Sequence, residues 1–193
     1  TSGCGTGGQA SYDMAICVAD DNANEVYIAG IIVWRSTNGG STFSPMTAWS
    51  LPNSIGYNHA DVHGLEWISG KIFSGSDGGI YRSNDRGDNW TDLSTGLGIR
   101  QFYRIANSKT VSTTFSGGAQ DNGSSIYKSS GWIDWLGADG MDAIISPLDA
   151  NLQWGTSQNG SLYRTSNGGS SYSNITEPAT GNWVTPIAVE SNS

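Results

Sequence analysis

The sequence is poor in basic residues and in long apolar runs. Only 9 of its 193 residues are Lys or Arg, against 17 Asp and Glu, which gives a formal net charge of −8. A protein that binds nucleic-acid phosphates needs clustered cations, so the composition argues against nucleic acid as a partner. No apolar run approaches the roughly 18–20 residues that cross a bilayer, and we therefore expect no membrane insertion.

Cysteine and charge are also scarce. Cys4 and Cys17 are too few for a disulfide framework and are not spaced as a zinc knuckle. Either they form a bridge in an oxidising compartment or they are two buried free thiols. Charged residues make up 13% of the chain, against a usual share of about 25%, and this disfavours long surface helices. With 27 glycines, eight Trp and eight Tyr, we expect a folded chain that is rich in turns.

A repeated motif is the strongest signal in the sequence. Residues 34–43 read WRSTNGGSTF, residues 81–90 read YRSNDRGDNW, and residues 163–172 read YRTSNGGSSY. A fourth, eroded copy, YKSSGWIDW, occupies residues 127–135. The copies are 47, 46 and 36 residues apart when counted from Ser36, Ser83, Ser129 and Thr165. This period is typical of a propeller blade, which takes about 40–50 residues.

The residue types of the motif indicate a tight turn between two strands. A short Asn or Asp side chain accepts hydrogen bonds from nearby backbone amides, and Gly adopts positive φ without strain. The closing aromatic residue, Phe43, Trp90 or Tyr172, then begins the next strand and can fold back over the hairpin. We therefore interpret the motif as structural.

Short apolar bursts around each copy predict four strands per repeat. The sequence therefore predicts an all-β fold, a β-propeller of four-stranded antiparallel blades. The predicted blades cover about residues 12–48, 60–95, 102–137 and 143–176, and residues 183–190 are predicted as the inner strand of a next blade. Blades bury their faces only against neighbours. The four blades are then either a small ring closed by the extra strand or, as we prefer, part of a larger ring of about seven blades.

The motif resembles the Asp-box, S-x-D-x-G-x-x-W, which is also called the bacterial neuraminidase repeat. One copy matches it fully and two match with relaxed positions: Ser83, Asp85, Gly87 and Trp90; Ser36, Asn38, Gly40 and Phe43; Thr165, Asn167, Gly169 and Tyr172. The phrases HADVHGLEW, GSDGGIYRS, GGAQDNGSSIY and GADGMDAIISP are similar to the propellers of secreted bacterial surface proteins that carry a C-terminal sorting domain. The chain is similar as well to the sortilin and xyloglucanase side of the superfamily.

The resemblance implies an exported or cell-surface protein whose ligand is a glycan or an extracellular protein. Function resides in sites rather than in folds, so two hypotheses remain. The first is a binding or scaffold module, with the rest of the propeller or another copy covering its open blade faces. The second is a glycoside hydrolase of the xyloglucanase or sialidase type.

A hydrolase needs two carboxylates on either side of the scissile bond, about 5–5.5 Å apart for retention or about 6.5–9.5 Å for inversion. The candidates lie near the predicted inner strands or in the loops that enter them: Asp61, Asp77, Asp121, Asp139 and Asp142. The alternative to a catalytic role is structural, because Asp beside Gly is most often a turn residue.

His59, Asp61 and His63 alternate along the strand predicted at residues 60–68 and the residue before it. Alternate side chains of a strand share one face, so the three predict a ligand or metal site, with calcium or zinc as the metal. The alternative is a pair of hydrogen-bonded histidines that support a turn. Apart from such a metal, the sequence implies no cofactor.

Overall fold

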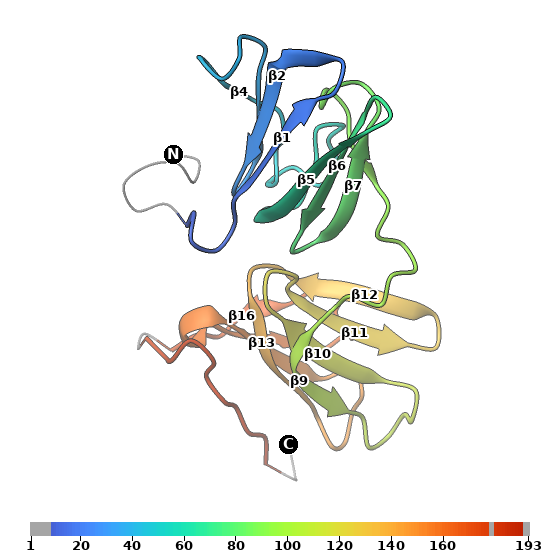
Figure 1. The fold of residues 1–193 in the computed structure, drawn as a ribbon. Coiled ribbons are helices and arrows are strands. Elements are labelled where there is room, and N and C mark those ends of the chain that lie inside the picture. Colours follow the sequence, from blue (N-terminus) through green and yellow to red (C-terminus); the bar gives the residue numbers. More distant parts are fainter. Residues whose placement is uncertain (1–8, 178–179, 191–193) are drawn as a thin grey trace. The chain divides into compact units, whose positions relative to one another are not determined.

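The computed structural model describes residues 9–177 and 180–190, which form four sheets of four antiparallel strands each (Figure 1). The described residues contain one short helical turn, η1 (Gln158–Gly160), and no helix among them is long and apolar enough to cross a membrane. The all-β fold class and the four predicted blades are therefore confirmed. The chain divides into two compact units, unit 1 (Thr1–Ile99) and unit 2 (Arg100–Ser193), with two blades in each.

Unit 1 contains blades 1 and 2, in which the strands follow one another in sheet order. Blade 1 consists of β1 (Ala15–Ala19), β2 (Asn22–Ala29), β3 (Val33–Ser36) and β4 (Ser44–Pro45). Blade 2 consists of β5 (Val62–Ile68), β6 (Lys71–Ser76), β7 (Gly79–Ser83) and β8 (Thr91–Asp92). The outermost strands of these two blades, β4 and β8, are short, and each pairs with its neighbour at only two positions.

Unit 2 contains blades 3 and 4, with the same meander order. Blade 3 consists of β9 (Phe102–Asn107), β10 (Phe115–Ala119), β11 (Ser124–Lys128) and β12 (Gly131–Leu136). Blade 4 consists of β13 (Gly140–Ile145), β14 (Gln153–Ser157), β15 (Leu162–Thr165) and β16 (Ser173–Asn174).

The structure differs from the prediction at residues 183–190, where no strand is assigned. A strand needs a partner for its backbone groups. In the described part of the chain, the backbone of this segment instead bonds to a turn and to a side chain. The carbonyl of Trp183 accepts from Asn159 N at 3.4 Å, and the amide of Ile187 donates to Asp142 Oδ2 at 3.2 Å.

The three intact motif copies form the same turn. In blade 2, Ser83 Oγ accepts from Gly87 N at 2.7 Å and donates to Asp85 Oδ1 at 2.8 Å. Asp85 Oδ1 also accepts from Asn89 N at 2.8 Å, and the Asn89 side chain is the main cause that lowers the pKa of Asp85. Trp90 closes the turn by donating from its indole to Gly87 O at 2.9 Å. The structural interpretation of the motif thus has a direct hydrogen-bond basis.

The eroded copy in blade 3 has a tighter hairpin instead. Lys128 of β11 pairs with Gly131 of β12, so only two residues join the strands. Trp135 is buried against blade 4, where its ring contacts that of Tyr172 edge-on with centroids 6.1 Å apart. Blade 3 therefore keeps the buried closing aromatic residue without the turn that positions it elsewhere.

Within unit 1, blade 1 packs against blade 2 through the face that carries the motif arginine, which we call the front face. Tyr27 on this face is 0% exposed and stacks on Trp67 of blade 2, with ring centroids 5.8 Å apart. The Tyr27 hydroxyl and Arg35 Nη1 both donate to the carbonyl oxygen of Arg86, at 3.0 and 2.8 Å. Arg86 also pairs with the buried Glu25 carboxylate. Apolar and polar contacts together therefore join the two blades.

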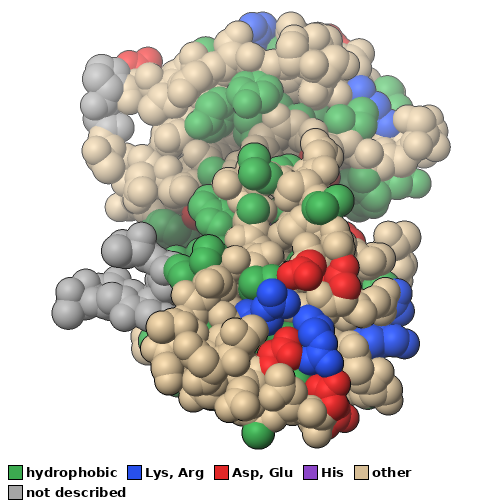
Figure 2. All heavy atoms as spheres, turned by 90° about the horizontal axis from the view of Figure 1, so that it is seen from above, with side chains coloured by type: hydrophobic (Ala, Val, Ile, Leu, Met, Phe, Trp, Pro, Cys, Tyr) green, Lys and Arg blue, Asp and Glu red, His purple; other side chains and the backbone are tan. Residues whose placement is uncertain are grey.

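The surface shows no large patch of one charge on the face drawn in Figure 2, where Lys and Arg side chains adjoin Asp and Glu side chains. Arg35 and Asp88 of unit 1 form such a pair, with Nη1 and Oδ1 3.3 Å apart. Exposed pairs of this kind contribute little to stability.

Cys17 lies half-buried on β1. Burial, with a smaller contribution from Glu66, raises its pKa to about 11. Cys4 lies outside the described residues, so the predicted choice between a bridge and two thiols stays a prediction.

Candidate functional site

Polar side chains gather in unit 1 where the chain enters the first strands of blades 1 and 2. Asp13 lies two residues before β1, Asp61 lies one residue before β5, and Asp77 lies between β6 and β7. We call this cluster the carboxylate site, and its members are Gln9, Tyr12, Asp13, Asp61, His63 and Asp77.

Asp77 is held from two sides. His63 Nε2 lies 2.8 Å from Asp77 Oδ1, and the Tyr12 hydroxyl donates to Asp77 Oδ2 at 2.9 Å. The Tyr12 ring in turn meets the His63 ring edge-on, with centroids 4.9 Å apart. Both oxygens of Asp77 are thus engaged, and three side chains from different segments fix one another.

Asp61 lies between two other carboxyl groups. Gln9 Nε2 donates to Asp61 Oδ1 and also to Asp13 Oδ2. A carboxylate oxygen of Asp61 lies within 4.8 Å of one of Asp77. Burial raises the pKa of Asp61, and the negative charges of Asp13 and then Asp77 raise it further.

An open pocket of about 470 Å³ adjoins the carboxylate site, and we call it the blade 2 pocket. His63 and Asp77 contribute polar side chains to its lining, and Ile80, Leu97 and Ile99 contribute aliphatic side chains. All three aliphatic side chains are substantially exposed. The arrangement combines an apolar surface with one oriented histidine–carboxylate pair.

The structure separates the predicted His59, Asp61 and His63 triad. The strand begins only at Val62, and Asp61 has a left-handed φ of 62°, so the alternation of side chains does not extend back to His59. His59 instead packs over Gly78, where a Cβ would come within 2.3 Å of the His59 ring, and its Nδ1 lies 3.1 Å from Ala60 O. His63 pairs with Asp77, and Asp61 contacts Asp13.

The three remaining predicted carboxylates, Asp121, Asp139 and Asp142, lie in unit 2, and two of them, Asp139 and Asp142, accept hydrogen bonds from backbone amides. Asp139 Oδ1 accepts from Asp121 N at 3.0 Å. Asp142 Oδ1 accepts from Ala143 N at 2.8 Å, and its Oδ2 accepts from Ile187 N. These contacts are typical of side chains that stabilise turns and segment ends.

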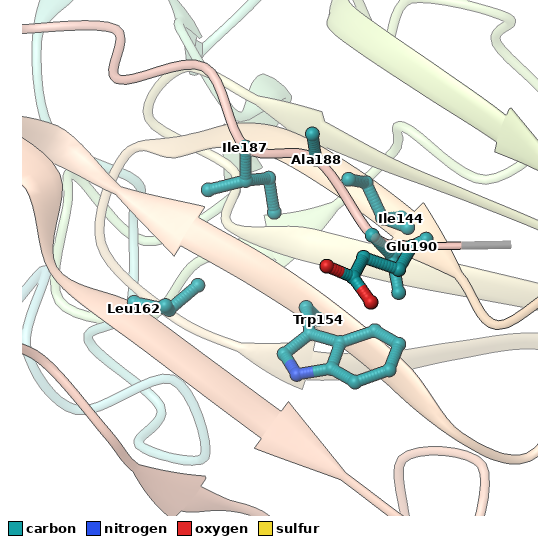
Figure 3. Close-up of a pocket in the computed structure, with 7 residues that line it drawn as sticks. Ile144, Trp154, Leu162, Ile187, Ala188 and Glu190 are labelled. Carbon is teal, nitrogen blue, oxygen red and sulfur yellow. The ribbon is translucent and has the colours of Figure 1, made fainter. Parts of the chain in front are cut away.

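Unit 2 has a second pocket of about 340 Å³ on the front face of blade 4 (Figure 3). Trp154 and Leu162 lie on the strands of the blade, while Ile187, Ala188 and Glu190 belong to the segment that crosses over them. The Glu190 carboxylate points toward the space above the Trp154 ring.

Sequence reasoning missed Gln9, Tyr12 and Asp13. One signal could have found Asp13, because an acidic residue precedes the first strand of three blades: Asp13, Asp61 and Asp139. Gln9 and Tyr12 carry no comparable pattern, since their roles depend on contacts across blades to Asp61 and Asp77.

No protein-family model and no curated protein matches the sequence. Among solved structures, an ancestral GH74 enzyme is 17% identical with a TM-score of 0.36, and the match covers 84% of this chain and 24% of that one. The GH74 xyloglucanase from Xanthomonas campestris is 13% identical with a TM-score of 0.33, covering 83% and 29%. YCF48 from Cyanidioschyzon merolae is 12% identical with a TM-score of 0.36, covering 89% and 87%.

The chain spans less than a third of the length of each of these GH74 structures. With identities below 25% and TM-scores below 0.5, none of these likenesses assigns a function to the chain.

Proposed function

We propose that the chain is a ligand-binding or scaffold module of an exported or cell-surface β-propeller of the Asp-box superfamily. The blade 2 pocket carries this proposal, because it places exposed aliphatic side chains beside the fixed His63–Asp77 pair. An open apolar surface with a few oriented polar groups is typical of a binding site. The ligand is an extracellular protein or a glycan.

The lining of the pocket favours a protein segment over a glycan. Sugar rings stack best on aromatic faces, whereas Ile80, Leu97 and Ile99 offer aliphatic surface that suits apolar side chains. His63 and Asp77 would supply hydrogen bonds that fix the orientation of the segment.

Binding to peptide and glycan arrays tests the proposal. Leu97→Ser and Ile99→Ser remove aliphatic surface from the pocket, so we expect each to weaken retention of the best ligand at least about tenfold, or about 1.4 kcal/mol. Ile16→Ser is the matched control, because Ile16 is also exposed on unit 1 but does not line the pocket. Equal retention by all three variants would show that the ligand binds elsewhere.

The module also needs a neighbour for the front face of blade 4. Trp154 pairs across the sheet with Arg164 as Tyr27 pairs with Arg35 in blade 1. Tyr27 is buried by blade 2, whereas Trp154 is only partly covered by residues 187–190. Because blade 2 covers the equivalent face of blade 1, we expect another blade to cover the front face of blade 4. That blade would come from the rest of the propeller or from another copy of the chain.

A specific observation favours glycoside hydrolysis as the second candidate. Asp61 and Asp77 bring carboxylate oxygens within 4.8 Å of each other beside an open pocket. A retaining hydrolase uses two carboxyl groups at about that spacing. Against it, both Asp77 oxygens are engaged by His63 and Tyr12, and Asp61 is bonded to Gln9.

A further inference from the structure

One oxygen of the Asp13 carboxyl group is buried without a hydrogen-bond partner among the described residues. Asp13 is 1% exposed, and the oxygen in question is Oδ1. Leaving a carboxylate oxygen dry and unpaired is costly, so buried carboxylates are paired with cations or coordinate metals. A cation or a proton at Asp13 would meet this requirement.

The neighbouring side chains do not supply that charge. The Asp13 and Asp61 carboxyl groups are neighbours, because both accept a hydrogen bond from the single amide nitrogen of Gln9. In the described residues, neither Asp13 nor Asp61 forms an ion pair with Lys, Arg or His. Two neighbouring carboxylates repel each other strongly in a partly dry site.

The spacing suits the ligands of one hard cation. Calcium binds oxygen atoms at 2.3–2.6 Å, so two of its ligand atoms lie at most about 5 Å apart. Asp13 and Asp61 both bond to the Gln9 amide nitrogen, and Asp61 and Asp77 have carboxylate oxygens within 4.8 Å of each other. Nε2 of His63 is engaged by Asp77, and the ligand atoms of Asp13, Asp61 and Asp77 are all oxygens, which favours calcium over zinc.

We propose that the carboxylate site binds a calcium ion between Asp13 Oδ1 and the Asp61 carboxylate. Asp77, oriented by His63 and Tyr12, adds negative charge on the Asp61 side and completes the shell through water. Because Asp13 precedes β1 and Asp61 precedes β5, the ion joins the entries of two blades and stabilises their packing. This site does not depend on the proposed ligand of the blade 2 pocket.

Calcium titration of the full chain tests the proposal. After treatment with chelator, the melting temperature should rise by several degrees as CaCl₂ is added to 5 mM. Tb³⁺ offers a second readout, since Tyr12 bonds to Asp77 and would sensitise the emission of a nearby lanthanide. We expect a half-saturating calcium concentration between about 10⁻⁵ and 10⁻³ M.

Matched variants identify the site. Asp13→Asn and Asp61→Asn should abolish both responses and, in chelator, melt no lower than the parent chain because each removes a repelling charge. Asp88→Asn is the control, because Asp88 lies on the surface of the same unit and pairs with Arg35. It should keep the calcium response. If Asp13→Asn does not fold, Asp61→Asn and Tb³⁺ emission decide alone.

Two results would overturn the proposal. One is an equal calcium response in the parent chain and in Asp61→Asn. The other is the absence of any calcium or Tb³⁺ response at pH 7. Stability that then rises on acidification would mean that a proton, not a metal ion, neutralises the Asp13–Asp61 pair.

Discussion

At the scale of single residues, the Ser or Thr of each intact motif copy holds the turn together through two hydrogen bonds. Ser36, Ser83 and Thr165 each accept a hydrogen bond from the glycine amide four residues later, at 2.7–2.9 Å. Each also donates to the Asn or Asp two residues later. This pattern was predictable because it is local: all of its atoms lie within a few residues of one another in sequence.

Ser83→Ala tests this role. The substitution removes the acceptor for Gly87 N, which is buried, and should lower the free energy of unfolding by about 1–3 kcal/mol in urea denaturation. Ser83→Thr should be nearly neutral, because Thr165 makes the same bonds in blade 4. Equal losses for the two variants would mean that packing, not the hydroxyl, accounts for the effect.

Residues whose roles depend on distant partners were less predictable. Asp61 was a candidate from its sequence position and lies in the carboxylate site, but its left-handed backbone moves it off the predicted strand face. Nothing in the sequence around Asp61 requires this conformation, since Gly is the usual residue at positive φ. Asp13 was missed because its partner Asp61 lies 48 positions away in the next blade.

At the scale of elements, the strands were predictable in kind and less so in their limits. Apolar bursts located every blade, but the burst at Val111 within the third predicted blade is not part of a strand, since β10 begins at Phe115. The intervening residues turn instead, with Thr114 N donating to Val111 O and Ser108 N to Thr114 O. A burst containing Val and Thr favours a strand by propensity, and local turn bonds override that preference.

Strands β10 and β13 of unit 2 approach so closely at Gly118 that no side chain fits there. A Cβ on Gly118 of β10 would lie 2.4 Å from both the backbone nitrogen and oxygen of Met141 on β13. Gly118→Ala should therefore lower the free energy of unfolding by about 3 kcal/mol or more, because backbone must move. Thermal and urea unfolding measure the loss.

Gly137→Ala is the control for that substitution. Gly137 lies in the same unit, has no positive φ, and has no atom within 4 Å of an added Cβ. It should change stability by less than about 0.5 kcal/mol. A Gly118 variant as stable as the Gly137 variant would contradict the close packing of β10 on β13.

At the scale of the whole molecule, the period of the motif predicted repeated four-stranded blades, because each blade is specified by its own local signals. Function was less accessible. The carboxylate candidates were chosen by their sequence positions, and only contacts between segments distinguish Asp61 and Asp77 from Asp139 and Asp142, which bond to backbone amides. A site built across blades has no contiguous signature.

The release of new reducing ends from a panel of β-glucans and other polysaccharides tests most directly whether this module binds without catalysis. The account predicts that the purified chain releases no more than buffer, and no more than its Asp61→Asn and Asp77→Asn variants, while it retains ligand through the blade 2 pocket. Hydrolysis by the parent chain that both substitutions abolish would contradict it and assign the two carboxylates to chemistry.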